Sequence, residues 1–259
     1  MYVWMNGRPK IISRRTFAHA REGSWSPLGE PIVPPKSIVA IVFGEDVPIR
    51  RFECPAEALL RIKTVTGITM TQAEVLDSVR LQAGNAAGVA AKAASRLASP
   101  DATAVAAFEN TFRVKHDSSW RAPAPGWSHS RIVRQRFLGV HRLLKSGALL
   151  YSCWGRPRGA GGPETSPDYL ALAQPGQYWI ALGRRYWEAN RDGDVDTTTH
   201  AFLFAALRAY YGPLLSDAPA TLAPPVRMLG NIHCYIQFIA NMFNAKLPNW
   251  VADNCPKGA

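Results

Sequence analysis

The pattern that most constrains the fold begins at Thr71. The segment Thr71-Gln-Ala-Glu74 has the spacing of a capping box, in which the Thr oxygen accepts from the third helical N–H and the Glu side chain reaches back. An Ala-rich stretch follows, with apolar residues on or near one stripe as far as Leu97, and Pro100 stops it. The sequence therefore predicts one long helix over residues 73–97, against which the rest of the chain has to pack.

Further helices and short strands follow this long helix. Apolar residues at helical spacing predict helices over 103–112, 130–145, 197–211 and 226–243, and β-rich runs predict strands over 148–153, 169–173 and 178–182. Gly84 and Gly88 either weaken the long helix or allow a close packing contact. We therefore expect an α+β domain over residues 71–243.

The two ends of the chain differ from this central part. Short β-rich runs at 37–43 and 47–52 lie among many Pro and Gly residues, which predicts a small β-rich region over residues 1–70. Residues 244–259 are polar and contain prolines, so we expect a tail that covers part of the surface.

Composition excludes several classes of protein. The 259 residues are 47% hydrophobic, which is enough for a sizeable core and rules out wholesale disorder. No apolar run reaches the roughly 18 residues that span a bilayer. The N-terminus lacks the basic and apolar regions of a classical signal peptide, so we expect synthesis in the cytoplasm, with export only by a specialised route.

The four cysteines do not form a CxxC pair, which excludes a zinc ribbon or a thioredoxin motif. They are Cys54, Cys153, Cys234 and Cys255. Without a classical signal peptide we expect free thiols, and one or two bridges are the alternative if the protein is exported.

Several segments in the second half of the chain form an ordered series. Leu149-Leu-Tyr-Ser-Cys153 is a strand candidate that ends in Cys, and residues 168–187 contain an edge strand, a turn, a second strand and an aromatic pair. Thr197-Thr-Thr-His200 begins one apolar helix, and Asn231 lies at the start of the last one. In this order, residues 75–243 resemble the deuterolysin-like or peptidyl-Lys-type zinc metalloendopeptidases, the aspzincins, in which the first of these helices resembles the zinc helix and the second the final helix. The resemblance implies a zincin-like metallopeptidase fold, of the kind found in bacterial secreted or injected proteins.

The residues that such an enzyme needs are mostly absent. An H-E-x-x-H motif supplies two zinc ligands and a general base, but this chain reads His200-Ala-Phe-Leu-Phe204. The general-base position is Ala201, the second ligand position is Phe204, and the third ligand position is Arg208, three residues before Tyr211. A guanidinium there would repel a dication. We therefore expect no zinc cofactor and a degenerate site.

Two alternatives keep some chemistry on these helices. His200 and His233 are weak candidates for metal ligands, if the two predicted helices bring them together. An unconventional hydrolase or toxin site could instead use His200, Tyr211 and His233 as catalytic residues, with Arg208 beside them.

The charge of the chain points to binding. Its formal net charge is +11, with arginines predominating. The loop Gly155-Arg-Pro-Arg-Gly-Ala-Gly-Gly162 places Arg156 and Arg158 in a basic, Gly-rich segment that lacks the order of a phosphate-binding P-loop. We therefore expect a pseudoenzyme that binds an acidic protein partner through Arg156, Arg158 and Arg208. The resemblance implies a bacterial effector or accessory protein. Nucleic-acid binding, which rests on charge alone, is a further alternative.

Overall fold

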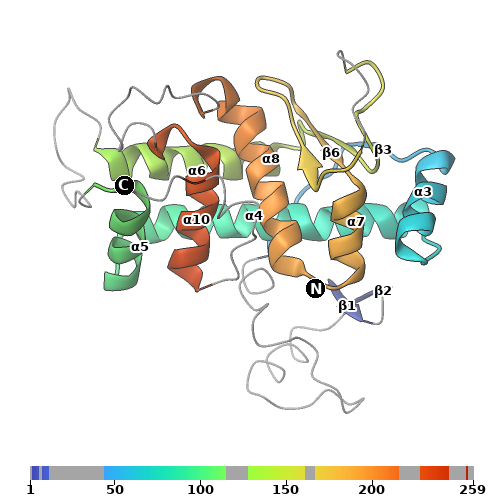
Figure 1. Cartoon of the computed structure of the whole chain (residues 1–259), viewed down its shortest axis with the longest axis horizontal. Coiled ribbons are helices and arrows are strands. Elements are labelled where there is room, and N and C mark those ends of the chain that lie inside the picture. The colour runs from blue at the N-terminus through green and yellow to red at the C-terminus, as the bar shows by residue number, and fades with distance from the viewer. Residues whose placement is uncertain are drawn as a thin grey trace, which may run out of the picture.

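The structure is a computed structural model of the chain, and it describes residues 2–5, 8–11, 44–114, 128–160, 167–215, 228–244 and 255. It is mixed α+β and mostly helical, with a small mixed sheet (Figure 1). The α+β prediction is therefore confirmed at that level. No helix in the described residues has the length and apolar character needed to cross a membrane.

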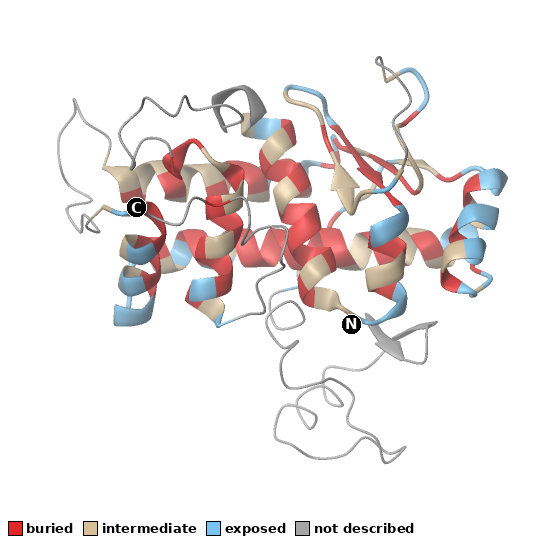
Figure 2. Cartoon of the chain, viewed as in Figure 1, coloured by how far each residue is buried: buried red, intermediate tan, exposed pale blue. Residues whose placement is uncertain are grey.

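Helix α4 (Gln72–Ala98) is the axis of the molecule and runs along most of its length in Figure 1. Its start is the predicted capping box, since Thr71 Oγ1 accepts from the Glu74 backbone N–H and the Glu74 carboxylate accepts from the Thr71 N–H. Helices α6 (His129–Ser146) and α8 (Val195–Leu215) pack along it. Figure 2 shows the buried faces of these three helices turned toward one another.

Two further helices form one end of the molecule. Helix α5 (Ala102–Phe112) packs on α10 (Ile232–Phe243), and α10 also packs on α8. Their shared core contains an aromatic cluster with ring centroids 5.1 to 6.1 Å apart, made by Phe108, Phe112, Phe137, Tyr235 and Phe238. The rings meet in tilted and edge-to-face arrangements, which fill the core at this end of the molecule.

The sheet forms the other end. Its strand order is β3-β4-β6-β5, with bounds Arg51–Glu53, Leu150–Ser152, Trp179–Leu182 and Ala171–Leu172. The first three strands are parallel, and the edge strand β5 is antiparallel to β6. Helix α8 contacts β5 and β6, whereas α7 (Arg184–Arg191) packs between α8 and α3 (Ala56–Thr66).

The N-terminal part differs from the sequence expectation. A helix, α3, occupies residues expected to hold only strands and loops, because Ala58, Ile62 and Thr66 lie four apart and form a buried face. Gly67 then ends the helix in the left-handed conformation, at φ 72°. The described strands here are β3 and the hairpin of β1 (Tyr2–Met5) and β2 (Arg8–Ile11), and the predicted strand 37–43 lies outside the described residues.

One of the two glycines of α4 has the packing role that the sequence allowed. Gly84 has no side chain, and its carbonyl accepts a hydrogen bond of 3.0 Å from the Glu45 N–H. A Cβ at this position would lie 2.1 Å from the Glu45 carbonyl oxygen. Gly84 therefore lets residue 45 cross α4 at backbone contact distance.

The expectation of free thiols is wrong in the structure, which pairs all four cysteines. Cys54 is bonded to Cys153 and Cys234 to Cys255. The sequence could not show this, because partners 99 residues apart meet only after the chain has folded and paired β3 with β4.

Candidate binding site

His200, the histidine that the sequence offers as a zinc-ligand candidate on α8, lies in the interior. It is on α8 with 3% of its surface exposed. Burial lowers its pKa to about 4, and the charge of Asp194 offsets this effect only in part. Within the described residues its Nδ1 has no hydrogen-bond partner. His200 is therefore a neutral imidazole enclosed by protein at neutral pH.

Phe204, at the position of the second histidine of an H-E-x-x-H motif, takes part in aromatic packing. The ring of Phe204 lies 4.8 Å from the imidazole of His233, which is on α10. Burial and the positive charge of Arg208 both lower the pKa of His233, so the guanidinium is close enough to oppose a second cation. The structure thus brings Phe204, His233 and Arg208 together, and their apolar and cationic character is unsuited to a dication.

Tyr211 has a structural contact. Its hydroxyl donates to the Gln135 carbonyl at 3.2 Å, which ties α8 to α6, and burial raises its pKa to about 12. A Cβ at Gly139 would lie 2.2 Å from this hydroxyl oxygen, so Gly139 makes the contact possible. In the described part of the chain, no three His, Cys, Asp or Glu residues are grouped so that they could hold a metal ion.

A pocket of about 490 Å³ lies at the other end of the molecule, beside α3. One wall is the first half of α3 with the residue before it, and the other is the Gly-rich loop that follows β4. The lining residues are Pro55, Glu57, Ala58, Arg61, Trp154, Gly155, Arg156, Pro157, Arg158, Ala160 and Pro167. Two of the three arginines predicted for binding, Arg156 and Arg158, are among them, whereas Arg208 is on α8.

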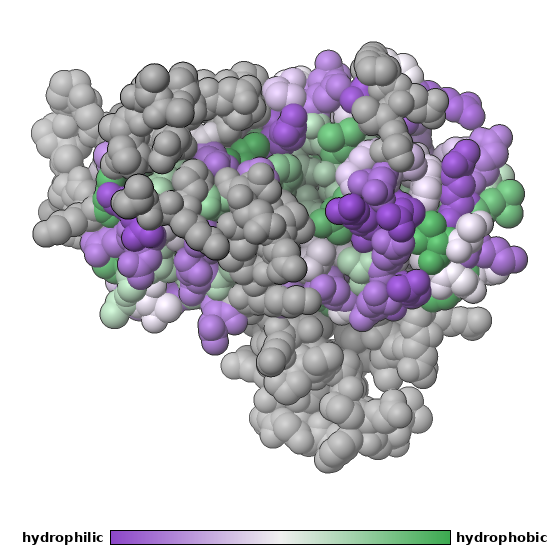
Figure 3. Space-filling model, viewed as in Figure 1, coloured by the Kyte–Doolittle hydropathy of each residue, from purple (hydrophilic) through white to green (hydrophobic). Residues whose placement is uncertain are grey.

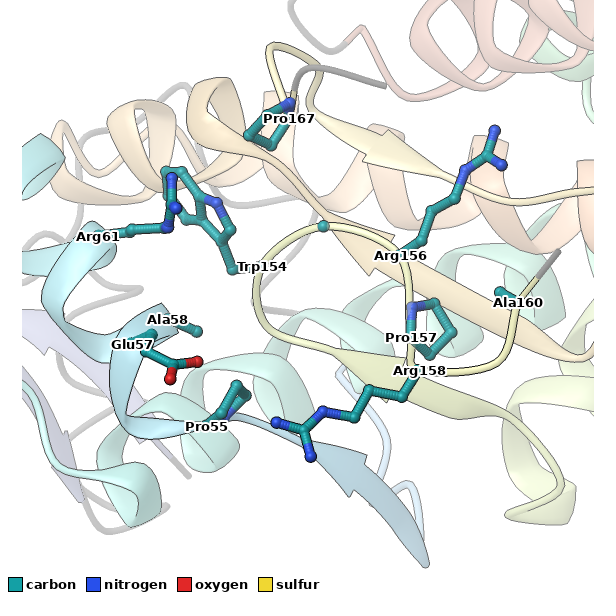
Figure 4. A pocket seen from close by; sticks show the side chains of 11 residues that line it. Pro55, Glu57, Ala58, Arg61, Trp154, Arg156, Pro157, Arg158, Ala160 and Pro167 are labelled. Atoms are coloured by element: carbon teal, nitrogen blue, oxygen red, sulfur yellow. The ribbon is translucent and has the colours of Figure 1, made fainter. Parts of the chain in front are cut away.

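Figure 4 shows how these side chains are arranged. Arg61 and Trp154 lie on one side, and Arg158 extends from the loop toward Pro55 and Glu57. Arg156 points away from them, and its charge acts on Tyr169, where it partly offsets the burial that raises the pKa of that phenol to about 12. Arg61 and Arg158 are therefore the two arginines whose charges face the pocket, whereas the side chain of Arg156 points away from it.

These two cations differ from the arginines of the neighbouring helix. Hydrophilic side chains cover α7 in Figure 3, but its arginines are paired with carboxylates: Arg184 with Asp168 and Glu188, and Arg191 with Asp192. Within the described residues, neither Arg61 nor Arg158 forms an ion pair, although Glu57 lines the same pocket. Both guanidinium groups are exposed and keep their donors for a ligand.

Backbone groups hold the pocket in this form. The Arg158 N–H donates to the Glu53 carboxylate at 3.0 Å, which fixes the loop against the end of β3. The N-cap of α3 is Pro55, which makes no side-chain cap hydrogen bond. Pro55, Glu57 and Ala58 line the pocket, so the positive end of the helix dipole lies beside it. Trp154 supplies an apolar wall that packs partly against the core. The arrangement suits an anionic group attached to an apolar chain.

Arg61 and Trp154 are pocket residues that the sequence does not predict. Both pocket walls begin directly after a cysteine, at Cys54-Pro55 and Cys153-Trp154, and this shared feature would connect them only if the pairing of the cysteines were known. Cysteines this far apart give no indication of their pairing in a single sequence.

No protein-family model and no curated protein sequence matches the chain.

Proposed function

We propose that this chain is a binding protein whose pocket between α3 and residues 154–160 takes an acidic segment of a partner protein. The observation that carries the proposal is a concave site in which two exposed arginines, Arg61 and Arg158, have no carboxylate partner among the described residues and lie beside Trp154. Arg and Trp are the residues that most often dominate protein interfaces. A carboxylate can accept two parallel hydrogen bonds from a guanidinium.

The charge of the whole chain supports the same partner. A net charge of +11 attracts an acidic protein over a distance comparable to the Debye length, about 10 Å at 0.1 M salt. The pocket then supplies the close contacts. Among the described lining residues Glu57 is the one carboxylate, and its negative charge opposes an acidic ligand group at that edge.

The family resemblance stays part of this proposal: the chain is a zincin-like scaffold that has exchanged catalysis for binding. The antiparallel edge strand β5, the buried pair Tyr186 and Trp187, and a helix carrying His200 behind the sheet support it. The burial of His200 and the contact of Phe204 with His233 favour binding over the alternative of an unconventional hydrolase.

The test is a titration with a short fluorescent Glu-rich peptide, compared with the same peptide carrying Gln for every Glu. We expect the wild-type protein to bind the Glu peptide more tightly, and Arg158→Glu to weaken this binding by about tenfold, or about 1.4 kcal/mol. Arg142→Glu is the matched control, because it makes the same change in net charge at an exposed position on α6 outside the pocket.

Three results would count against the proposal. Equal binding of the Glu and Gln peptides would remove the acidic partner, and equal losses in Arg158→Glu and Arg142→Glu would remove the pocket. Tighter binding of a single-stranded oligonucleotide, weakened by Arg158→Glu, would favour nucleic acid as the partner.

A further inference from the structure

The two walls of the pocket are joined by a covalent bond. Cys54 directly precedes Pro55 in the α3 wall, and Cys153 directly precedes Trp154 in the loop wall. Their disulfide brings the two Cα atoms to 5.2 Å. Both cysteines are buried, so the bond lies behind the pocket, under the lining residues.

Backbone pairing joins the two segments up to the disulfide. Strands β3 and β4 pair in parallel as far as Glu53 and Ser152, and the Cys153 N–H donates to the Glu53 carbonyl at 2.9 Å. After this point the two segments diverge, one into α3 and the other into the loop. Beyond the disulfide, the Arg158 N–H of the loop donates to the Glu53 side chain at 3.0 Å.

Both walls also contact α7. Helix α3 packs on α7, and the indole N–H of Trp187, which is on α7, donates to the Cys153 carbonyl at 2.8 Å. These noncovalent contacts place both walls against the same helix. The disulfide adds the covalent bond that joins the residue before Pro55 directly to the residue before Trp154.

We propose that the pocket is in its binding form only while Cys54 and Cys153 are oxidised, and therefore that the protein binds its partner in an oxidising compartment. This inference rests on the proposed function and adds its redox condition. It agrees with the pairing of all four cysteines, which is typical of proteins that work outside a reducing cytosol.

The chemical change is a thiol–disulfide exchange. A dithiol reductant breaks the Sγ–Sγ bond, the two sulfurs gain two electrons and two protons in total, and the reductant becomes a cyclic disulfide. The second bridge, Cys234–Cys255, supplies an internal control. Its Cys234 is on α10, which packs on α5 and α8, whereas α3, which lines the pocket, lies at the other end of the molecule in Figure 1.

The experiment compares the oxidised wild-type protein with two double variants, Cys54→Ser/Cys153→Ser and Cys234→Ser/Cys255→Ser, as binders of the Glu-rich peptide. Circular dichroism first establishes that each variant is folded at the assay temperature. We expect the first variant to bind at least about tenfold more weakly, because its walls are no longer preorganised. The second variant should bind within about twofold of wild type. Equal losses in the two variants, or no loss in the first, would overturn the inference.

A second measurement does not depend on the peptide or on a variant. Hydrogen exchange is followed by mass spectrometry in the wild-type protein before and after treatment with dithiothreitol. We expect faster exchange in residues 55–61 and 154–160 and unchanged protection in the middle of α4. Unchanged exchange in both pocket segments after verified reduction would overturn the inference. If the oxidised protein shows no preference for the Glu peptide while the two segments still loosen on reduction, the proposed function fails and the redox dependence of the pocket stands.

Discussion

The interior around His200 and the surface pocket around Arg158 differ in how far their polar side chains are exposed to solvent. On α8 a single histidine is enclosed, its pKa is lowered to about 4, and the neighbouring positions hold Ala201 and Phe204. Beside α3, arginines are left exposed in a concave site. A helix that resembles a catalytic one, α8, can thus form part of the stabilising core. The charged groups that remain exposed lie elsewhere, on α3 and on the loop after β4.

The largest expected effect is on stability, from substitution in the interior. Phe202 on α8 is fully buried and stacks on Tyr151, with ring centroids 6.0 Å apart. We expect Phe202→Ala to lower the free energy of unfolding by about 3–5 kcal/mol, measured by urea denaturation. Phe204 is only half-buried, so Phe204→Ala should cost less than Phe202→Ala. The reverse order would contradict the placement of α8.

A smaller effect on stability comes from acid. Burial lowers the pKa of His200 to about 4 in the folded protein, whereas an unperturbed histidine in the unfolded chain has a pKa of about 6.5. The unfolded chain therefore binds more protons between these values, and stability is lost as pH falls from about 6.5 to about 4. We expect this histidine to contribute a loss of about 2–4 kcal/mol over that range.

The matched variant for this prediction is His200→Gln, which cannot gain a proton. Its free energy of unfolding should depend less on pH in that window than that of wild type, even if it is less stable at pH 7. Parallel pH profiles would show that His200 is not held neutral by burial.

The third effect is on affinity and leaves the core intact. Arg61→Glu should weaken binding of the Glu-rich peptide by about tenfold. The unfolding free energy should change by less than about 0.5 kcal/mol, because the side chain is exposed and forms no ion pair within the described residues. Isothermal titration calorimetry and urea denaturation on the same sample separate the two quantities. A large loss of stability would mean that Arg61 is part of the structural support.

The smallest expected effect is a gain. Glu57 lines the pocket with Arg61 and Arg158, so its carboxylate repels an acidic ligand. We expect Glu57→Gln to strengthen binding of the Glu-rich peptide by about two- to fivefold, the range of an exposed charge pair. The gain should shrink as salt is raised, because the groups are exposed to solvent. Weaker binding in Glu57→Gln would indicate that this carboxylate contacts a donor on the ligand.

The central helices could be predicted from the sequence because their signals are local. The capping box at Thr71, the apolar periodicity of α6 and the two apolar helices near the C-terminus all appear in the structure. Helix α3 was missed because its buried face is short and lies among Pro and Gly residues. Helix α7 was missed because an arginine-rich segment carries only a few buried side chains.

Only part of the candidate site could be predicted, because a sequence shows local patterns and not long-range contacts. Arg156 and Arg158 stand in one conspicuous loop, so composition alone pointed to them. Arg61 reaches the same pocket from α3 only because β3 pairs with β4 and Cys54 bonds to Cys153. Contacts of this kind join residues about a hundred positions apart, and no local pattern records them.

The most direct test of the central claim is to map where the Glu-rich peptide binds. Nuclear magnetic resonance of the oxidised, isotope-labelled protein gives one signal for each backbone amide and for each Trp indole. The account predicts that titration shifts the signals of Arg61, the Trp154 indole and Arg158 together, with one affinity, and that the Gln peptide shifts none of them. Shifts centred instead on His200 and His233 of α8 and α10 would contradict it.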